Sequence, residues 1–183
     1  MHRCDLLDQL ARYQTRHLDE AAFVQRARQF VAAHPDTFYR EHLPAHVSAS
    51  TWVVNPARTA VLLMHHRKLD CWLQPGGHAD GATDMRAVAL QECAEETGVS
   101  PEHIRLVHEG IFDVDIHSTQ EPHPDAQPHE HIDIRYLVEI DDRTPVPGNE
   151  ESFALHWIPL PLVARYNNSR STLRMVDKTR RMR

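Results

Sequence analysis

The hydrophobic pattern of this chain changes its period near residue 45. Apolar residues of the segment 5–34 recur at the three- and four-residue spacing of amphipathic helices, so this segment is predicted to be helical. Beyond it, short apolar runs, several with clear alternation, are typical of strands. These predicted strands cover residues 47–54, 59–64, 104–116 (one or two strands), 132–140 and 153–158. A C-terminal helix is expected from about Pro161.

One long segment between the predicted strands is helical in pattern. No Gly or Pro interrupts Thr83 to Thr97, and Gly98 follows where a helix commonly ends on glycine. Strands around one central helix, with helices at both ends, predict an α/β/α sandwich. We divide the chain into an N-terminal helical extension, residues 1–44, and a main domain, residues 45–183. The extension is expected to pack on the main domain or on a second subunit of a homodimer.

Composition narrows the class of protein. The 183 residues carry a net charge of −6, which argues against a surface built mainly for nucleic acid. Three cysteines without a CxxC pair, no apolar leader and no long apolar run predict a cytoplasmic protein without disulfides or membrane spans. The last nineteen residues, however, hold seven basic residues against Asp177 alone. This tail could attract polyanions or nucleic acid, although a solvated terminal helix is the favoured interpretation.

Three carboxylates break local rules along the predicted central helix. Glu92, Glu95 and Glu96 continue the helical stripe of the apolar residues before them, although like charges at this spacing repel each other. They also lie at the C-terminal end, where the helix dipole disfavours anions. Oxygen ligands of this kind suit Mg²⁺ or Mn²⁺. A solvated acidic face is the alternative.

The segment Gly77–Val99 resembles the Nudix box, whose pattern is G-x5-E-x7-R-E-U-x-E-E-x-G-U, with U a bulky apolar residue. The positions that fit are Gly77, Glu92, Cys93, Glu95, Glu96, Gly98 and Val99. Two positions depart from the pattern: Thr83 replaces its first Glu and Gln91 its Arg. Since these two family residues mainly support the metal-binding carboxylates, their joint loss leaves no unpaired charge.

The resemblance implies a Nudix-like α/β/α sandwich with a mixed sheet and a metal-dependent hydrolase of small diphosphate compounds. It implies that the Gly77 carbonyl, Glu92, Glu95 and Glu96 hold Mg²⁺ or Mn²⁺, with Glu95 also among the catalytic residues. The general base often comes from outside the box, and Glu151 is our candidate. Its rivals are Glu121 and Glu130, in and beside a long polar loop that spans residues 117–128 and could form a lid.

Four residues are candidates for substrate binding. Strand alternation places His131, Asp133 and Arg135 on one face, from which Arg135 could contact phosphate. Arg67 follows a predicted strand, and His78 follows Gly77. The chain holds 15 histidines, so a softer metal such as Zn²⁺ is conceivable, but the sequence shows no zinc spacing motif.

Two other functions compete with hydrolysis. Isopentenyl diphosphate isomerase has a Nudix-like fold with a His/Glu metal site, but it needs an active-site cysteine, and Cys71 is in no recognisable motif for one. The departures at Thr83 and Gln91 could instead mark a Nudix domain that binds a ligand without turnover. The three carboxylates of the box argue against this second alternative.

Overall fold

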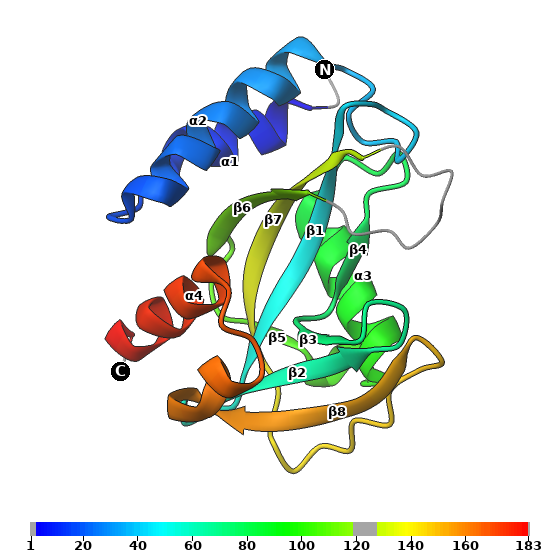
Figure 1. The fold of residues 1–183 in the computed structure, drawn as a ribbon, viewed down its shortest axis with the longest axis vertical. Coiled ribbons are helices and arrows are strands. Elements are labelled where there is room, and N and C mark those ends of the chain that lie inside the picture. Colours follow the sequence, from blue (N-terminus) through cyan, green and yellow to red (C-terminus); the bar gives the residue numbers. More distant parts are fainter. Residues whose placement is uncertain (1–2, 119–127, 183) are drawn as a thin grey trace.

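The computed structural model describes residues 3–118 and 128–182 (Figure 1). Within them lie four α-helices: α1 (Cys4–Arg12), α2 (Leu18–Ala33), α3 (Met85–Thr97) and α4 (Arg170–Arg181). The same residues form eight strands: β1 (Ala45–Val54), β2 (Ala60–His66), β3 (Cys71–Leu73), β4 (Gly76–His78), β5 (Arg105–Leu106), β6 (Asp113–Ser118), β7 (Glu130–Glu139) and β8 (Ser152–Pro159). Two short 3₁₀ helices, η1 (Pro101–His103) and η2 (Leu160–Arg165), complete the described elements.

All eight strands belong to one mixed sheet. Its central order is β3-β2-β1-β7-β5, while β4 pairs with β1, β6 with β7 and β8 with β2. β1 and β7 run parallel over ten residue pairs, and the other pairings are antiparallel. All ten residues of β1 are buried, as expected for a strand with covered faces.

Helices cover both faces of this sheet, which confirms the predicted α/β/α sandwich (Figure 1). Ile132, Ile134 and Tyr136 of β7 share a core with apolar residues of α3. Trp52 of β1 lies in a second core with apolar residues of α4, and its indole N–H donates to Thr179 Oγ1 over 2.9 Å. Alternate residues of the central strands therefore face different helices.

The N-terminal helices pack on the main body, which is one of the two positions expected for the extension. Leu6 and Leu10 of α1 and Val31 of α2 belong to the same core as β7 and α3. The Tyr136 hydroxyl also donates to Gln9 Oε1 of α1 over 3.0 Å. Among the described residues, no helix is both long and apolar enough to cross a membrane.

Several element boundaries differ from the sequence-based prediction. The sequence pattern missed β3 and β4, because each has three residues and β4 contains the glycine pair. The central helix begins at Met85 rather than Thr83, since the Asp84 carboxylate caps it by accepting from Ala87 N–H. The C-terminal segment forms η2 and then α4, with Ser169 as the N-cap of α4.

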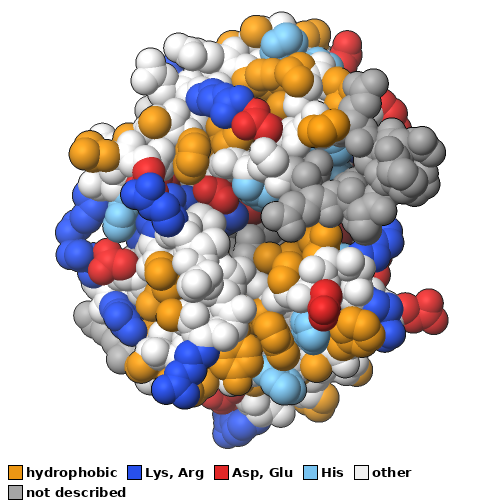
Figure 2. Space-filling view, viewed as in Figure 1, with side chains coloured by type: hydrophobic (Ala, Val, Ile, Leu, Met, Phe, Trp, Pro, Cys, Tyr) orange, Lys and Arg blue, Asp and Glu red, His pale blue; other side chains and the backbone are white. Residues whose placement is uncertain are grey.

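Two basic residues of α4 turn inward rather than towards solvent, which corrects the interpretation of this tail as a solvated helix. Arg174 donates to both carboxylate oxygens of Asp113, over 2.9 and 2.8 Å. Lys178 Nζ donates to Asp113 over 2.6 Å and to Glu20 over 2.5 Å. Asp113 and Glu20 are completely buried, so inward-facing cations neutralise two carboxylates beneath α4. Figure 2 shows other Lys and Arg side chains on the surface around α4.

Arg135 belongs to the same buried ionic network. This residue is 3 % exposed, and its guanidinium donates to Asp133 over 2.7 Å, Asp115 over 3.0 Å and Asp113 over 3.3 Å. Burial raises the pKa of Asp113, yet bonds and charges of Arg174, Arg135 and Lys178 outweigh it and hold the pKa below its ordinary value.

We expect Asp113→Asn to lower the free energy of unfolding by about 3–5 kcal/mol, because it leaves buried cations uncompensated. Urea denaturation at pH 7 measures this change. The control is Asp141→Asn, which removes an exposed carboxylate paired with Arg143 and should leave stability nearly unchanged. Equal effects of the two substitutions would contradict the assigned role of the network.

Candidate active site

The site is built where the C-terminal half of α3 lies against β4. α3 ends at Gly98, whose φ of +69° is the left-handed conformation that glycine adopts readily. The backbone N–H of Gly76 donates to Glu96 Oε2 over 2.8 Å. Glu96 is only 4 % exposed, Glu92 is half-buried and Glu95 is exposed. The structure therefore brings the three carboxylates of the box together with the glycine pair.

Both positions must be glycine, because neighbouring atoms lie too close to the backbone to leave room for a Cβ. A Cβ on Gly76 would lie 2.3 Å from Ser50 Cβ on the neighbouring strand β1. A Cβ on Gly77 would lie 2.5 Å from Glu92 Cδ, so the Glu92 carboxylate rests directly on the Gly77 backbone. This contact puts the expected metal-binding carboxylate next to the residue whose carbonyl is expected to join it.

Gln91, one of the two departures from the box pattern, takes a supporting position. Its amide donates from Nε2 to Glu95 Oε1 over 2.8 Å, so it orients this carboxylate with a neutral group. Thr83, the other departure, lies half-buried just before α3. Gln91 thus donates a hydrogen bond to Glu95 without adding charge to the site.

Two of the carboxyl groups on α3, those of Glu92 and Glu96, have raised pKa values. Burial raises the pKa of Glu96 to about 8, and the nearby charges of Glu92 and Glu151 add to the effect. Burial also raises the pKa of Glu92 to about 7, with further contributions from Glu95 and Glu151. Two carboxyl groups that resist ionisation in one place are typical of functional sites.

Glu151 lies within electrostatic reach of this site. The segment before β8 is fixed to the end of α3, because Gly148 N–H donates to the Thr97 carbonyl over 2.9 Å. Glu151 is exposed, and its charge contributes to the raised pKa values of Glu92 and Glu96. The rival Glu130 instead pairs with Arg26 of α2, and Glu121 lies outside the described residues.

Arg67 takes a different position from the one expected of a phosphate-binding residue. Its guanidinium donates to the carbonyls of Glu150, over 2.9 Å, and Ser152, over 3.1 Å. It also lies over the ring of Phe153, 4.4 Å from the centroid. Arg67 therefore holds the segment that carries Glu151, and a contact with phosphate would compete with these bonds.

The other substrate-binding candidates lie on the opposite face of the sheet from α3. His131 and Arg135 do share one face of β7, but Arg135 is committed to three aspartates, which does not fit its expected contact with phosphate. His78 Nε2 lies 3.3 Å from His131 Nε2. Most of the loop at residues 117–128, expected to form a lid, lies outside the described residues.

Sequence reasoning missed one ion pair near the carboxylates. Arg40 Nε donates to Asp80 over 2.7 Å, and both residues influence the pKa of Glu92, which Asp80 raises and Arg40 lowers. Arg40 lies outside the box and Asp80 occupies one of its variable positions, so only Asp80, three residues after Gly77, could have been suspected from proximity.

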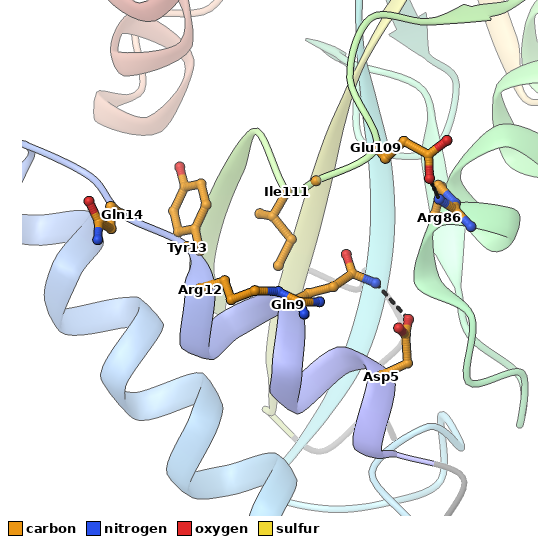
Figure 3. Close-up of a pocket in the computed structure, with 9 residues that line it drawn as sticks. Asp5, Gln9, Arg12, Tyr13, Gln14, Arg86, Glu109 and Ile111 are labelled. Carbon is orange, nitrogen blue, oxygen red and sulfur yellow. Dashed lines mark hydrogen bonds and ion pairs between the residues drawn. The ribbon is translucent and has the colours of Figure 1, made fainter.

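A separate pocket of about 630 Å³ lies beside α1 (Figure 3). Its lining includes Gln9, which donates to Asp5 over 2.7 Å, and Arg86, which donates to Glu109 over 2.7 Å. The carboxylates of the box are not among its lining residues, so this pocket is distinct from the candidate active site.

Comparison with models of protein families shows which family the chain belongs to. The model of the NUDIX domain matches residues 44–177, which include β1, the glycine pair, α3 and most of α4. The chain belongs to the Nudix family. The match begins one residue before β1 and leaves out α1 and α2. A comparison with curated proteins found no match.

Solved Nudix structures share the fold at low sequence identity. An Ap4A hydrolase of C. elegans in a binary complex is 17% identical, with a TM-score of 0.59, and the match covers 74% of this chain and 96% of that chain. A NUDIX-family hydrolase from Clostridium perfringens is 21% identical, with a TM-score of 0.55 and coverages of 75% and 98%. A UDP-X diphosphatase is 12% identical, with a TM-score of 0.54 and coverages of 97% and 89%. The last match extends into the N-terminal helices.

The raised pKa values give this Nudix protein a testable pH dependence. A carboxyl group whose pKa is higher in the folded state than in the unfolded state stabilises the fold at low pH. That stability is lost as the pH rises from about 4.5 to about 8. We therefore expect Glu96→Gln, which can still accept from Gly76, to stabilise the metal-free protein at pH 8 by on the order of 2 kcal/mol.

Urea denaturation with a chelator at pH 5 and pH 8 measures this difference. The matched control is Glu95→Gln, which changes an exposed carboxylate of the same helix turn and should alter stability little at either pH. If Glu96→Gln is less stable than wild type at pH 8, then the ionised Glu96 carboxylate does not destabilise the folded protein, and the prediction is wrong.

Proposed function

We propose that this protein is a Mg²⁺- or Mn²⁺-dependent pyrophosphohydrolase that cleaves a diphosphate bond in a nucleoside-diphosphate-linked or similar small molecule. The observation that carries the proposal is the gathering of Glu92, Glu95 and Glu96 against Gly76 and Gly77, with two of the three carboxyl groups resisting ionisation. Membership of the Nudix family supports this reaction class. So do the names of similar structures, which include an Ap4A hydrolase and a UDP-X diphosphatase.

The donor set fits a hard divalent cation. Carboxylate oxygens and a backbone carbonyl are ligands that Mg²⁺ and Mn²⁺ accept, and cation binding would relieve the repulsion among the three carboxylates. Glu92, Glu95, Glu96 and the carbonyl of Gly77 would hold the ions. When bound, such ions neutralise phosphate charge and lower the pKa of bound water.

In the proposed reaction, the protein supplies a general base and holds it in position. In this reaction the Glu151 carboxylate takes the proton from the water that attacks phosphorus, and the diphosphate bond breaks to give two phosphorylated products. Arg67 fixes the backbone on both sides of Glu151 through its bonds to the carbonyls of Glu150 and Ser152. Accurate placement of the base is worth more than extra contacts in phosphoryl chemistry, which depends mainly on positioning and electrostatics.

The cysteines argue against the isomerase alternative. Burial raises the pKa of Cys93 to about 12 and also raises the pKa of Cys71. Both shifts disfavour the thiolate form, and Cys4 is an exposed residue of α1 on the far N-terminal helix. Neither Cys71 nor Cys93 is therefore an activated thiol.

The first experiment is an assay of product release from a panel of nucleoside diphosphate derivatives with Mg²⁺ and Mn²⁺. We expect metal-dependent cleavage that falls by at least about 100-fold in Glu96→Gln. Glu102→Gln, an exposed carboxylate on η1, should leave the rate unchanged. Absence of turnover with retained metal and ligand binding would favour the non-catalytic binding domain.

A second experiment tests the base. We expect Glu151→Gln to lower kcat by about 10²–10⁴ with little change in KM, because general-base catalysis is lost while binding is kept. Glu150→Gln is the matched control, since Glu150 is the adjacent exposed carboxylate, whereas Glu151 is among the main contributors to the pKa shifts of Glu92 and Glu96. Equal kcat values for the two variants would mean that another group takes the proton.

A further inference from the structure

On the face of the sheet opposite α3, the rings of His78, His129 and His131 gather around that of His46, and the ring of His117 lies 5.6 Å from that of His131. His46 is the second residue of β1, His131 is the second residue of β7, and the parallel register pairs them directly. His78 ends β4 and pairs with Ser48 of β1, while His129 precedes β7 by one residue. The ring centroid of His46 lies 5.1 Å from that of His78, 4.8 Å from that of His129 and 4.7 Å from that of His131.

The spacing of the ring nitrogens suits one shared ion. One ligand nitrogen from each of His46, His129 and His131 lies within 4.8 Å of the other two. His78 Nε2 and His131 Nε2 are 3.3 Å apart. Two nitrogens on a tetrahedral Zn²⁺, each about 2.0–2.1 Å from the metal, are separated by about 3.3 Å. Small side-chain rotations would therefore close the cluster around an ion.

His46 provides a second, independent observation. It is 1 % exposed, and neither of its ring nitrogens has a hydrogen-bond partner among the described residues. An imidazole left without a partner in such a buried position is energetically unfavourable. The rings of His78, His129 and His131 surround the His46 ring, so its ring nitrogens lie within the cluster.

The chemistry of the donors separates this cluster from the carboxylate site. Imidazole suits Zn²⁺, Cu²⁺ and Ni²⁺, whereas carboxylate oxygens suit Mg²⁺ and Mn²⁺. Burial and neighbouring rings lower the pKa of His46 to about 4, so its imidazole is in the neutral form that metals require. Burial likewise lowers the pKa of His131.

We propose that His46, His129 and His131, with His78 as a fourth ligand, form a second metal site that binds Zn²⁺ or a similar transition-metal ion. The ion ties the beginnings of β1 and β7 to the end of β4. The site does not depend on the proposed hydrolase activity, because it shares no ligand with the carboxylates of α3.

The test uses full-length protein without a histidine tag, stripped of metal with a chelator. Titration with Zn²⁺ by calorimetry gives affinity and stoichiometry, and the visible absorption of Co²⁺ reports tetrahedral coordination. We expect one tight Zn²⁺ per chain. Loss of a ligand in His46→Gln or His131→Gln should weaken binding at least about 100-fold, since even outer-shell changes cost 10–100-fold. His129→Gln, a change at a half-buried position outside the strand, supplies the same test if either variant fails to fold.

Two controls locate the ion. The double variant His103→Gln/His108→Gln changes exposed histidines, and Glu96→Gln changes the carboxylate site; both should keep the Zn²⁺ affinity of wild type. The proposal is wrong if folded His131→Gln and His129→Gln bind Zn²⁺ as tightly as wild type, or if Glu96→Gln abolishes binding. It is also wrong if inorganic phosphate, and not Zn²⁺, raises the melting temperature in a manner that requires His131.

Discussion

The parallel pairing of β1 with β7 is the constraint on which the rest of this structure depends. Parallel neighbours cannot be joined by a tight turn, so a long connection must leave β1 and return to β7. Here that connection, residues 55–129, contains the glycine pair, the helix α3 and its three carboxylates. The ten paired residues fix where this connection starts and ends. The same register also brings His46 beside His131, although 84 positions separate them along the chain.

Buried acids occur in two contrasting settings on the two faces of the sheet. Asp113 is completely buried, yet Arg174, Arg135 and Lys178 hold its pKa below the ordinary value. Glu96 is nearly as buried, and its pKa is raised to about 8 because the described residues supply one backbone N–H and no cation bonded to it. The first setting is complete without a ligand and stabilises the fold. The second has no bonded cation among the described residues, and this contrast is what leads us to propose a cation site there.

Local sequence patterns predicted the elements whose evidence lies within one segment. The helical period from Met85 and the glycine at 98 located α3, and alternation placed His131, Asp133 and Arg135 on one face of β7. The same alternation could not show what covers that face. Arg135 was therefore expected to meet phosphate, whereas it bonds three aspartates from β6 and β7. Its partners come from a strand whose position is set only by tertiary pairing.

The missed features share this dependence on distant segments. β4 was not predicted, because glycine is disfavoured in strands. Here the Gly-Gly pair forms a strand because it pairs with β1 at close approach. From the sequence alone, Arg174 and Lys178 are typical of a solvated helix. Their partners Asp113 and Glu20 come from distant segments, so only the structure shows these ion pairs. The histidines were visible as an excess in composition, but no spacing along the chain could show which of them meet.

Strand β4 connects the two candidate metal sites through a single peptide unit. Gly77 pairs with Ala49 and lies against Glu92, while His78 pairs with Ser48 and points to the other face of the sheet. Alternation along a strand makes this arrangement unavoidable once both residues are in the ladder. An ion held by His78 would restrict β4 and with it the Gly77 carbonyl of the adjacent peptide unit. Any effect of one ion on the affinity of the other must then be reciprocal, because coupling between two binding equilibria is symmetric.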